Sequence, residues 1–170
     1  MSRLSIIHLV SFILYVLFQV LILKNAVLFH TAFCFLYIAF LLSLPVELER
    51  MWLLLIGFVL GAAVDVFYDS LGLHASATVL IAFLRNRWLA VLTPQGGYDN
   101  NAIPAVSAFG PQWFVTYSVP MVLVHHSVLF FTEAGGFDYF WDTLIKIAVS
   151  TIFTVLVMLV IEFIFPRKRL

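Results

Sequence analysis

Apolar residues fill most of the chain in long runs, and polar or turn-forming residues gather between those runs. Runs of about 20 apolar residues have the length at which a helix crosses the hydrocarbon core of a bilayer. We therefore predict an all-α polytopic membrane protein whose six transmembrane helices form one integral membrane domain, residues 1–170. The predicted spans are residues 4–23, 26–44, 51–68, 73–92, 113–131 and 143–165.

The breaks between the runs support this division. Residues 93–112 contain Gly, Pro and Asn without a helical period, which predicts a loop. The first run follows the basic residue Arg3, as the apolar region of a cleavable signal peptide would. That run is nearer 20 residues than the roughly 7–15 of a signal peptide, and no small-residue cleavage site follows it. We expect a retained first span.

The composition supports a membrane protein and argues against other classes. Hydrophobic residues make up 64% of the chain and charged residues 11%, whereas soluble domains carry about 25% charged residues. The formal net charge is +0, and no basic face for nucleic acid is visible. Cys34 is the one cysteine, so we expect it to behave as a small buried hydrophobe.

The basic residues predict that both termini lie in the cytoplasm, because cytoplasmic loops of membrane proteins are enriched in Lys and Arg. With six spans, only Lys24 and Lys146 fall on the outer side. The basic residues on the inner side are Arg3, Arg50, Arg85, Arg87, Arg167, Lys168 and Arg169.

Two arginines interrupt the fourth span. From Leu73 to Leu84 the helix would reach only about 18 Å, whereas a bilayer core is about 30 Å thick. Arg85 and Arg87 must therefore snorkel to the surface, line a protein cavity or find partners. The candidate partners for ion pairs on the cytoplasmic side are Glu47, Glu49 and Glu162.

The third span ends in the stretch "GFVLGAAVDVFYDSLGLHA", residues 57–75. Gly57, Gly61 and Asp65 are spaced four residues apart, so each drifts only about 40° around the helix from the one before. The two glycines permit close approach of another backbone. This face could pack within the chain, or it could bind the transmembrane helix of a partner.

Asp65 needs a partner or a proton, since an ionised Asp at the centre of a membrane helix costs about 2.5–3.5 kcal/mol. Asp69 is expected at the membrane interface, and Gly72 is expected to end the turn before His74. The candidate partners of Asp65 are polar groups in the outer half of the membrane: His30, His74, His126 and Lys24.

The polar residues do not form a recognisable catalytic set. An aspartyl protease needs carboxylates on two facing helices, but Asp69 lies on the same helix as Asp65. Neither Ser76 nor Ser107 sits in the Gly-flanked loop of a membrane serine protease, and a di-iron oxidase needs several histidine motifs. We expect no enzymatic activity and no cofactor. A haem or metal site remains an alternative, because histidines fall at one depth: His30, His74 and either His125 or His126.

Residues 57–84 resemble the most recognisable segment of MreD, the bacterial rod shape-determining membrane protein family. The matching pattern is Gly57, three apolar residues, Gly61, three apolar residues, Asp65, and a short turn that ends at Gly72 and Leu73. The chain length, the predicted spans and the short basic tail are also similar to that family.

The resemblance implies a non-enzymatic scaffold in the bacterial cytoplasmic (inner) membrane. It would act in the cell-elongation (rod) complex and help to organise peptidoglycan synthesis and cell shape. The implied partners are the single-span periplasmic protein MreC, the actin-like MreB, the RodA polymerase and the elongation-specific transpeptidase. Partner binding would involve Gly57, Gly61, the turn from Asp69 to Gly72, and His74.

The resemblance also implies a fold similar to the substrate-binding subunits of energy-coupling-factor transporters. A small-solute binding subunit is therefore the alternative function. Such subunits contact their energising partner through an Ala-x-x-x-Ala pattern near the N-terminus, and residues 5–25 contain no alanine. This difference favours the scaffold.

Overall fold

The computed structural model describes residues 3–166, and its regular elements in that range are helices. One isolated bridge pairs Leu28 with Ala32 in an antiparallel sense. The elements, in chain order, are α1 (Arg3–Leu21), the 3-10 turn η1 (Leu23–Asn25), α2 (Ile38–Leu42), α3 (Arg50–Tyr68), α4 (Leu73–Val91), α5 (Val106–Phe109), α6 (Pro111–Glu133) and α7 (Phe140–Ile164).

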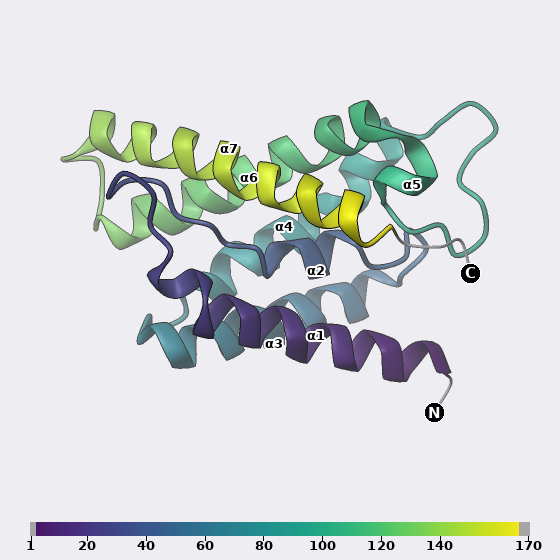
Figure 1. The fold of residues 1–170 in the computed structure, drawn as a ribbon, viewed down its shortest axis with the longest axis horizontal. Helices are drawn as coiled ribbons and strands as arrows, with labels where there is room; N and C mark the ends of the chain where they lie inside the picture. Colours follow the sequence, from purple (N-terminus) through teal and green to yellow (C-terminus); the bar gives the residue numbers. More distant parts are fainter. Residues whose placement is uncertain (1–2, 167–170) are drawn as a thin grey trace.

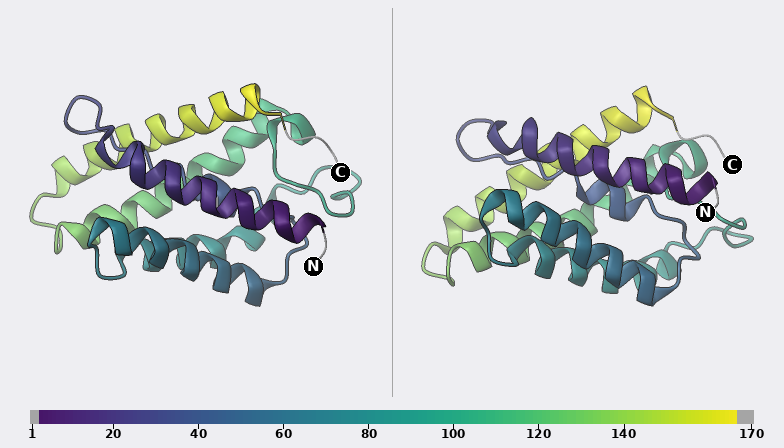
Figure 2. Two further views of the ribbon diagram at one scale, coloured as in Figure 1. Left: turned by 60° about the horizontal axis from the view of Figure 1, so that its bottom comes forward. Right: turned by 90° about the horizontal axis from the view of Figure 1, so that it is seen from below.

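The five long helices run along the longest axis of the molecule, and their connections gather at its two ends (Figure 1). We call the end with the start of α1 and the end of α7 the terminal end, and the opposite end the turn end. Helices α1 and α3 pack on one side, α6 and α7 on the other, and α4 packs against both α3 and α6. Figure 2 shows α1 lying alongside α3.

Within residues 3–166, four segments are long and apolar enough to cross a membrane: Ile6–Asn25, Arg50–Tyr68, Pro111–Glu133 and Phe140–Ile164. They correspond to the first, third, fifth and sixth predicted spans, and their outward faces carry apolar side chains such as Leu14, Phe58 and Ile152. Helix α4 has 19 residues, but Arg85, Asn86 and Arg87 make it less apolar. The side of the membrane that each end faces stays a prediction.

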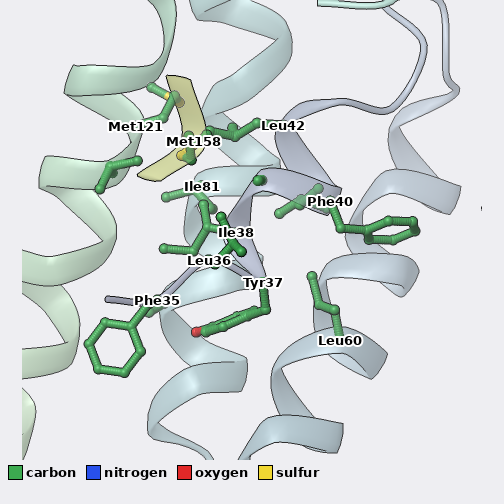
Figure 3. Close-up of a cluster of buried hydrophobic side chains, with 14 of the residues drawn as sticks. Phe35, Leu36, Tyr37, Ile38, Phe40, Leu42, Leu60, Ile81, Met121 and Met158 are labelled. Atoms are coloured by element: carbon green, nitrogen blue, oxygen red, sulfur yellow. The ribbon is translucent and has the colours of Figure 1, made fainter. Parts of the chain in front are cut away.

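The predicted helix across residues 26–44 is wrong. The chain there is irregular up to Tyr37, and only Ile38–Leu42 form a short helix, α2. The side chains from Cys34 to Leu42 are nevertheless buried, and they fill the centre of the bundle between α3, α4, α6 and α7. Figure 3 shows Phe35, Leu36 and Ile38 among Leu60, Ile81, Met121 and Met158. We call residues 33–44 the central segment.

Before α2 begins, the backbone of the central segment forms hydrogen bonds with side chains on other helices. Irregular backbone is tolerated at membrane depth only where protein or water satisfies its polar groups. Phe33 N–H donates to Ser150 Oγ at 3.0 Å, and Phe35 N–H donates to Thr154 Oγ1 at 3.2 Å. From α1, Gln19 Nε2 donates to the Cys34 carbonyl at 3.0 Å. Thus α1 and α7 stabilise a conformation that the segment could not hold alone.

Candidate functional site

Asp65 lies near the end of α3 and caps the start of α4. Its Oδ1 accepts the backbone N–H of His74 at 3.0 Å, and its Oδ2 accepts that of Ala75 at 2.9 Å. Ser70 Oγ also donates to Oδ1 at 2.7 Å. The first N–H groups of a helix lack partners within the helix and favour negative charge. Asp65 supplies the acceptors that the N-cap residue of α4, Gly72, lacks.

The turn between α3 and α4 depends on two residues in the left-handed region of backbone conformation. Asp69 ends α3 with φ of 54°, and Gly72 precedes α4 with φ of 87°. Asp and Asn tolerate this conformation better than most residues with a side chain. The side chain of Asp69 is exposed at the turn end, while that of Asp65 is buried. The two aspartates therefore have different roles.

Gly57 and Gly61 are covered by α4 of the same chain. A Cβ atom added at Gly61 would lie 2.6 Å from Ala75 N, and closer still to Ala75 Cα and Thr78 Oγ1. At Gly57 the nearest atoms would be Ala82 Cβ at 3.1 Å and the Thr78 carbonyl oxygen at 3.2 Å. Thr78 Oγ1 also donates to the Gly57 carbonyl at 2.8 Å. The structure thus shows the first of the two alternatives for this face, which is packing within the chain.

The four candidate partners of Asp65 lie in different places. His74 contacts Asp65 through its backbone N–H, while its imidazole faces the central segment. Lys24 Nζ donates to the Phe67 carbonyl at 2.5 Å and lies over the Tyr68 ring. His30 occupies an exposed loop with φ of 59°. His126 Nδ1 lies 2.7 Å from the Val122 carbonyl oxygen.

Tyr37 of the central segment joins two of the histidines. Its hydroxyl lies 2.9 Å from His74 Nδ1 and 2.7 Å from His125 Nε2, and all three side chains are buried. Phe35 packs its ring against both imidazoles. Sequence reasoning missed this role of Tyr37, because a helix through residues 26–44 would place its side chain differently.

The hydrogen bonds of Tyr37 determine where the protons lie. A hydroxyl has one proton, so Tyr37 donates to one imidazole and accepts from the other. Among the described residues, His125 Nδ1 has no hydrogen-bond partner. A buried orphan N–H is rarer than an under-used acceptor. We therefore assign the proton of His125 to Nε2, which donates to Tyr37, and the Tyr37 proton to the bond with His74.

The histidines are close together but do not form a metal site. Within residues 3–166, no group of three His, Cys, Asp or Glu side chains could hold a metal ion. The inward ring nitrogens of His74 and His125 face Tyr37, and His126 Nε2 lies 3.3 Å from Thr154 Oγ1. For two of these histidines to bind a haem iron, these hydrogen bonds would have to break. The arrangement positions the central segment.

Arg85 is completely buried, and its contacts differ from those expected. Its Nε donates to Tyr117 Oη at 2.9 Å, and its Nη2 donates to the carbonyls of Leu42, at 3.4 Å, and Leu44. These carbonyls end α2, where the partial charge is negative. Buried arginines in membranes commonly pair with backbone carbonyls. Arg85 thus caps the central segment.

The predicted cytoplasmic-side ion pairs are wrong for both arginines. In the described part of the chain, the one salt bridge joins Lys146 to Glu133 at 2.9 Å. Arg87 instead lies over the Phe83 ring, and Glu162 Oε2 accepts the backbone N–H of Val106 at 3.2 Å. Glu47 and Glu49 are exposed in the connection before α3. None of the three glutamates lies within 4.0 Å of the guanidinium group of Arg85 or Arg87.

A groove of about 480 Å³ separates α1 from α3 toward the terminal end. Its walls include Phe12, Phe40, Trp52 and Val59, and His8 is its one polar lining residue among those described. None of the hydrogen-bonded core residues, such as Tyr37 and Asp65, lines this groove. The groove and the buried polar network are therefore separate features.

Comparison of the chain with protein-family models, with curated proteins and with solved structures gives no match.

Proposed function

We propose that this chain is a non-enzymatic scaffold subunit of the bacterial cell-elongation complex, acting in the cytoplasmic membrane beside an MreC-like single-span protein. The observation that supports the proposal is the close packing of α3 against α4. Each position that resembles the MreD pattern has a structural task there: Gly57 and Gly61 admit α4, Asp65 caps it, and Gly72 begins it. A rigid hairpin suits a protein that orients its partners.

The contact with a partner is better assigned to exposed surfaces than to the glycine face, because α4 already occupies that face. At the turn end, the side chain of Leu71 is fully exposed and that of Phe29 is 91% exposed. Both belong to turns between helices. We assign the MreC-like protein's contact to this end, where its periplasmic base would lie in the predicted orientation.

The buried network favours a scaffold over a small-solute binding subunit. Ligand pockets combine apolar walls with a few convergent polar groups. The polar side chains around Tyr37 bond to one another and to backbone, and aromatic rings cover them. The groove between α1 and α3 offers His8 alone among the described polar side chains. A wall of this composition offers little to select a polar solute.

Co-purification from native membranes tests the proposal. We expect the tagged chain to recover an MreC-like protein, and Leu71→Asp to reduce that recovery about tenfold by placing a charge in the contact. Gln95→Asp, an exposed position at the terminal end, is the matched control and should keep full recovery. The proposed function fails if the unmodified chain recovers no elongation protein. The proposed surface fails if Leu71→Asp recovers as much MreC-like protein as the unmodified chain.

A further inference from the structure

Two arginines from different helices converge on one aromatic ring at the terminal end. The guanidinium carbon of Arg50, at the start of α3, lies 4.6 Å from the centre of the Phe83 ring. That of Arg87, near the end of α4, lies 4.9 Å from the same centre. Both arginine side chains are exposed. Each contact is in the range of a cation–π interaction.

In the described part of the chain, no carboxylate pairs with either arginine. Among residues 3–166, no Asp or Glu oxygen lies within 4.0 Å of either guanidinium group. The one salt bridge in that range, Lys146–Glu133, lies at the turn end. Glu49 directly precedes Arg50 but does not pair with it. The N–H donors of the two guanidinium groups can therefore point outward, toward an anion. A guanidinium fork matches the geometry of phosphate oxygens.

Exposed apolar residues of α4 adjoin the arginine pair. Leu80 and Phe83 are 36% and 37% exposed. Leu80, Phe83 and Arg87 are spaced three and four residues apart, so they share one face of α4. Cationic groups next to a lipid-facing apolar strip match a phospholipid, with its phosphate at the surface and its chains in the hydrocarbon.

We propose that Arg50, Phe83 and Arg87 form a binding site for the phosphate headgroup of an anionic phospholipid. Basic pockets between membrane helices bind anionic headgroups, and the cytoplasmic leaflet is rich in such lipids. The site lies at the end that the basic residues predict to be cytoplasmic. The lipid would join the start of α3 to the end of α4 and so hold the hairpin at the end opposite to Asp65. This inference does not depend on the proposed function.

Lipid titration of the purified full chain in uncharged detergent tests the site. We expect dioctanoyl phosphatidylglycerol to bind more tightly than dioctanoyl phosphatidylcholine, with native mass spectrometry as the readout. Each basic residue near an anionic surface contributes about fivefold in affinity, so Arg50→Gln with Arg87→Gln should weaken binding about 30-fold. Arg3→Gln removes one charge at the start of α1 and leaves Arg50 and Arg87 in place, so it should keep the affinity of the unmodified chain within about twofold.

Several outcomes would overturn the proposal. They are equal affinity of the double variant and the unmodified chain, an equal loss in Arg3→Gln, and equal binding of the two lipids. Competition by glycerol 3-phosphate as strong as that by the lipid would assign the site to a free phosphate instead. If the double variant does not fold, Arg87→Gln alone should lose about fivefold. An unchanged affinity there contradicts the site equally well.

Discussion

At the scale of single residues, the carboxylate of Asp65 links two helices through three hydrogen bonds. The sequence predicts that Asp65 needs a partner or a proton, but the candidate partners that it offers are side chains. The backbone N–H groups that it binds cannot be read from residue types. They become donors only when the turn brings the start of α4 beside the end of α3.

Substitution of Asp65 should separate hydrogen bonding from charge. Asp65→Asn keeps one acceptor oxygen and should lower the free energy of unfolding by about 1 kcal/mol. Asp65→Leu leaves the N–H groups of His74 and Ala75 unpaired and should cost about 3 kcal/mol. Thermal unfolding in detergent measures both changes. Asp69→Asn is the control and should be nearly neutral, because Asp69 is exposed and Asn also tolerates its left-handed backbone conformation. Equal stability of Asp65→Asn and Asp65→Leu would mean that the cap does not matter.

Alanine substitution at Gly57 and at Gly61 should change the free energy of unfolding by very different amounts, although the two sequence contexts are alike. Gly61→Ala forces a methyl group into the Ala75 backbone and should cost about 3 kcal/mol. At Gly57→Ala the neighbours lie farther away, and the gain in helix propensity of about 1 kcal/mol offsets the crowding. Unfolding midpoints measured side by side give the comparison. If Gly57→Ala is as damaging as Gly61→Ala, the close approach is not centred on Gly61.

At the scale of elements, hydropathy and length predicted the bounds of α1, α3, α4, α6 and α7 to within a few residues. Except for α4, these helices lie in segments long and apolar enough to cross a membrane. The central segment could not be predicted in the same way. Its residues are as apolar as those of a membrane helix, and composition does not distinguish lipid from a protein interior. The polar residues that support its backbone, Gln19, Ser150 and Thr154, are distant in sequence and individually unremarkable in a helix.

Cys34 offers a natural reporter on the central segment. Gln19 bonds to the Cys34 carbonyl, to the Tyr37 N–H and to the Tyr68 hydroxyl. Gln19→Leu leaves these groups unsatisfied, so local opening should become more frequent and maleimide labelling of the buried Cys34 about tenfold faster. The exposed Gln112→Leu should label at the unmodified rate. An unchanged rate in Gln19→Leu would show that other contacts hold the segment.

At the scale of the whole molecule, the described chain begins and ends at the terminal end, with an irregular segment making one of the passes along the axis (Figure 1). Arg50, Arg85 and Arg87 lie toward that end, on helices that begin or finish there. The charge distribution that predicted the orientation is therefore compatible with the fold, even though one of the six predicted helices is absent.

Accessibility of introduced cysteines tests that orientation. In a Cys34→Ala background, Asp138→Cys at the turn end should react with a membrane-impermeant maleimide in intact spheroplasts. Gln95→Cys, at the terminal end, should react only after the membrane is opened. Both positions are exposed. The reverse pattern would place both termini outside and contradict the orientation.

The hydrogen bonds from α7 to the central segment also impose an order on biosynthesis. Residues 33–35 leave the ribosome more than one hundred residues before Ser150 and Thr154, the side chains that receive their N–H groups. Until α7 is made, the N–H groups of Phe33 and Phe35 lack the acceptors that they have in the folded chain. The central segment is therefore among the last parts of the chain to fold. A truncation that keeps this segment but removes α7 leaves the N–H groups of Phe33 and Phe35 without these acceptors.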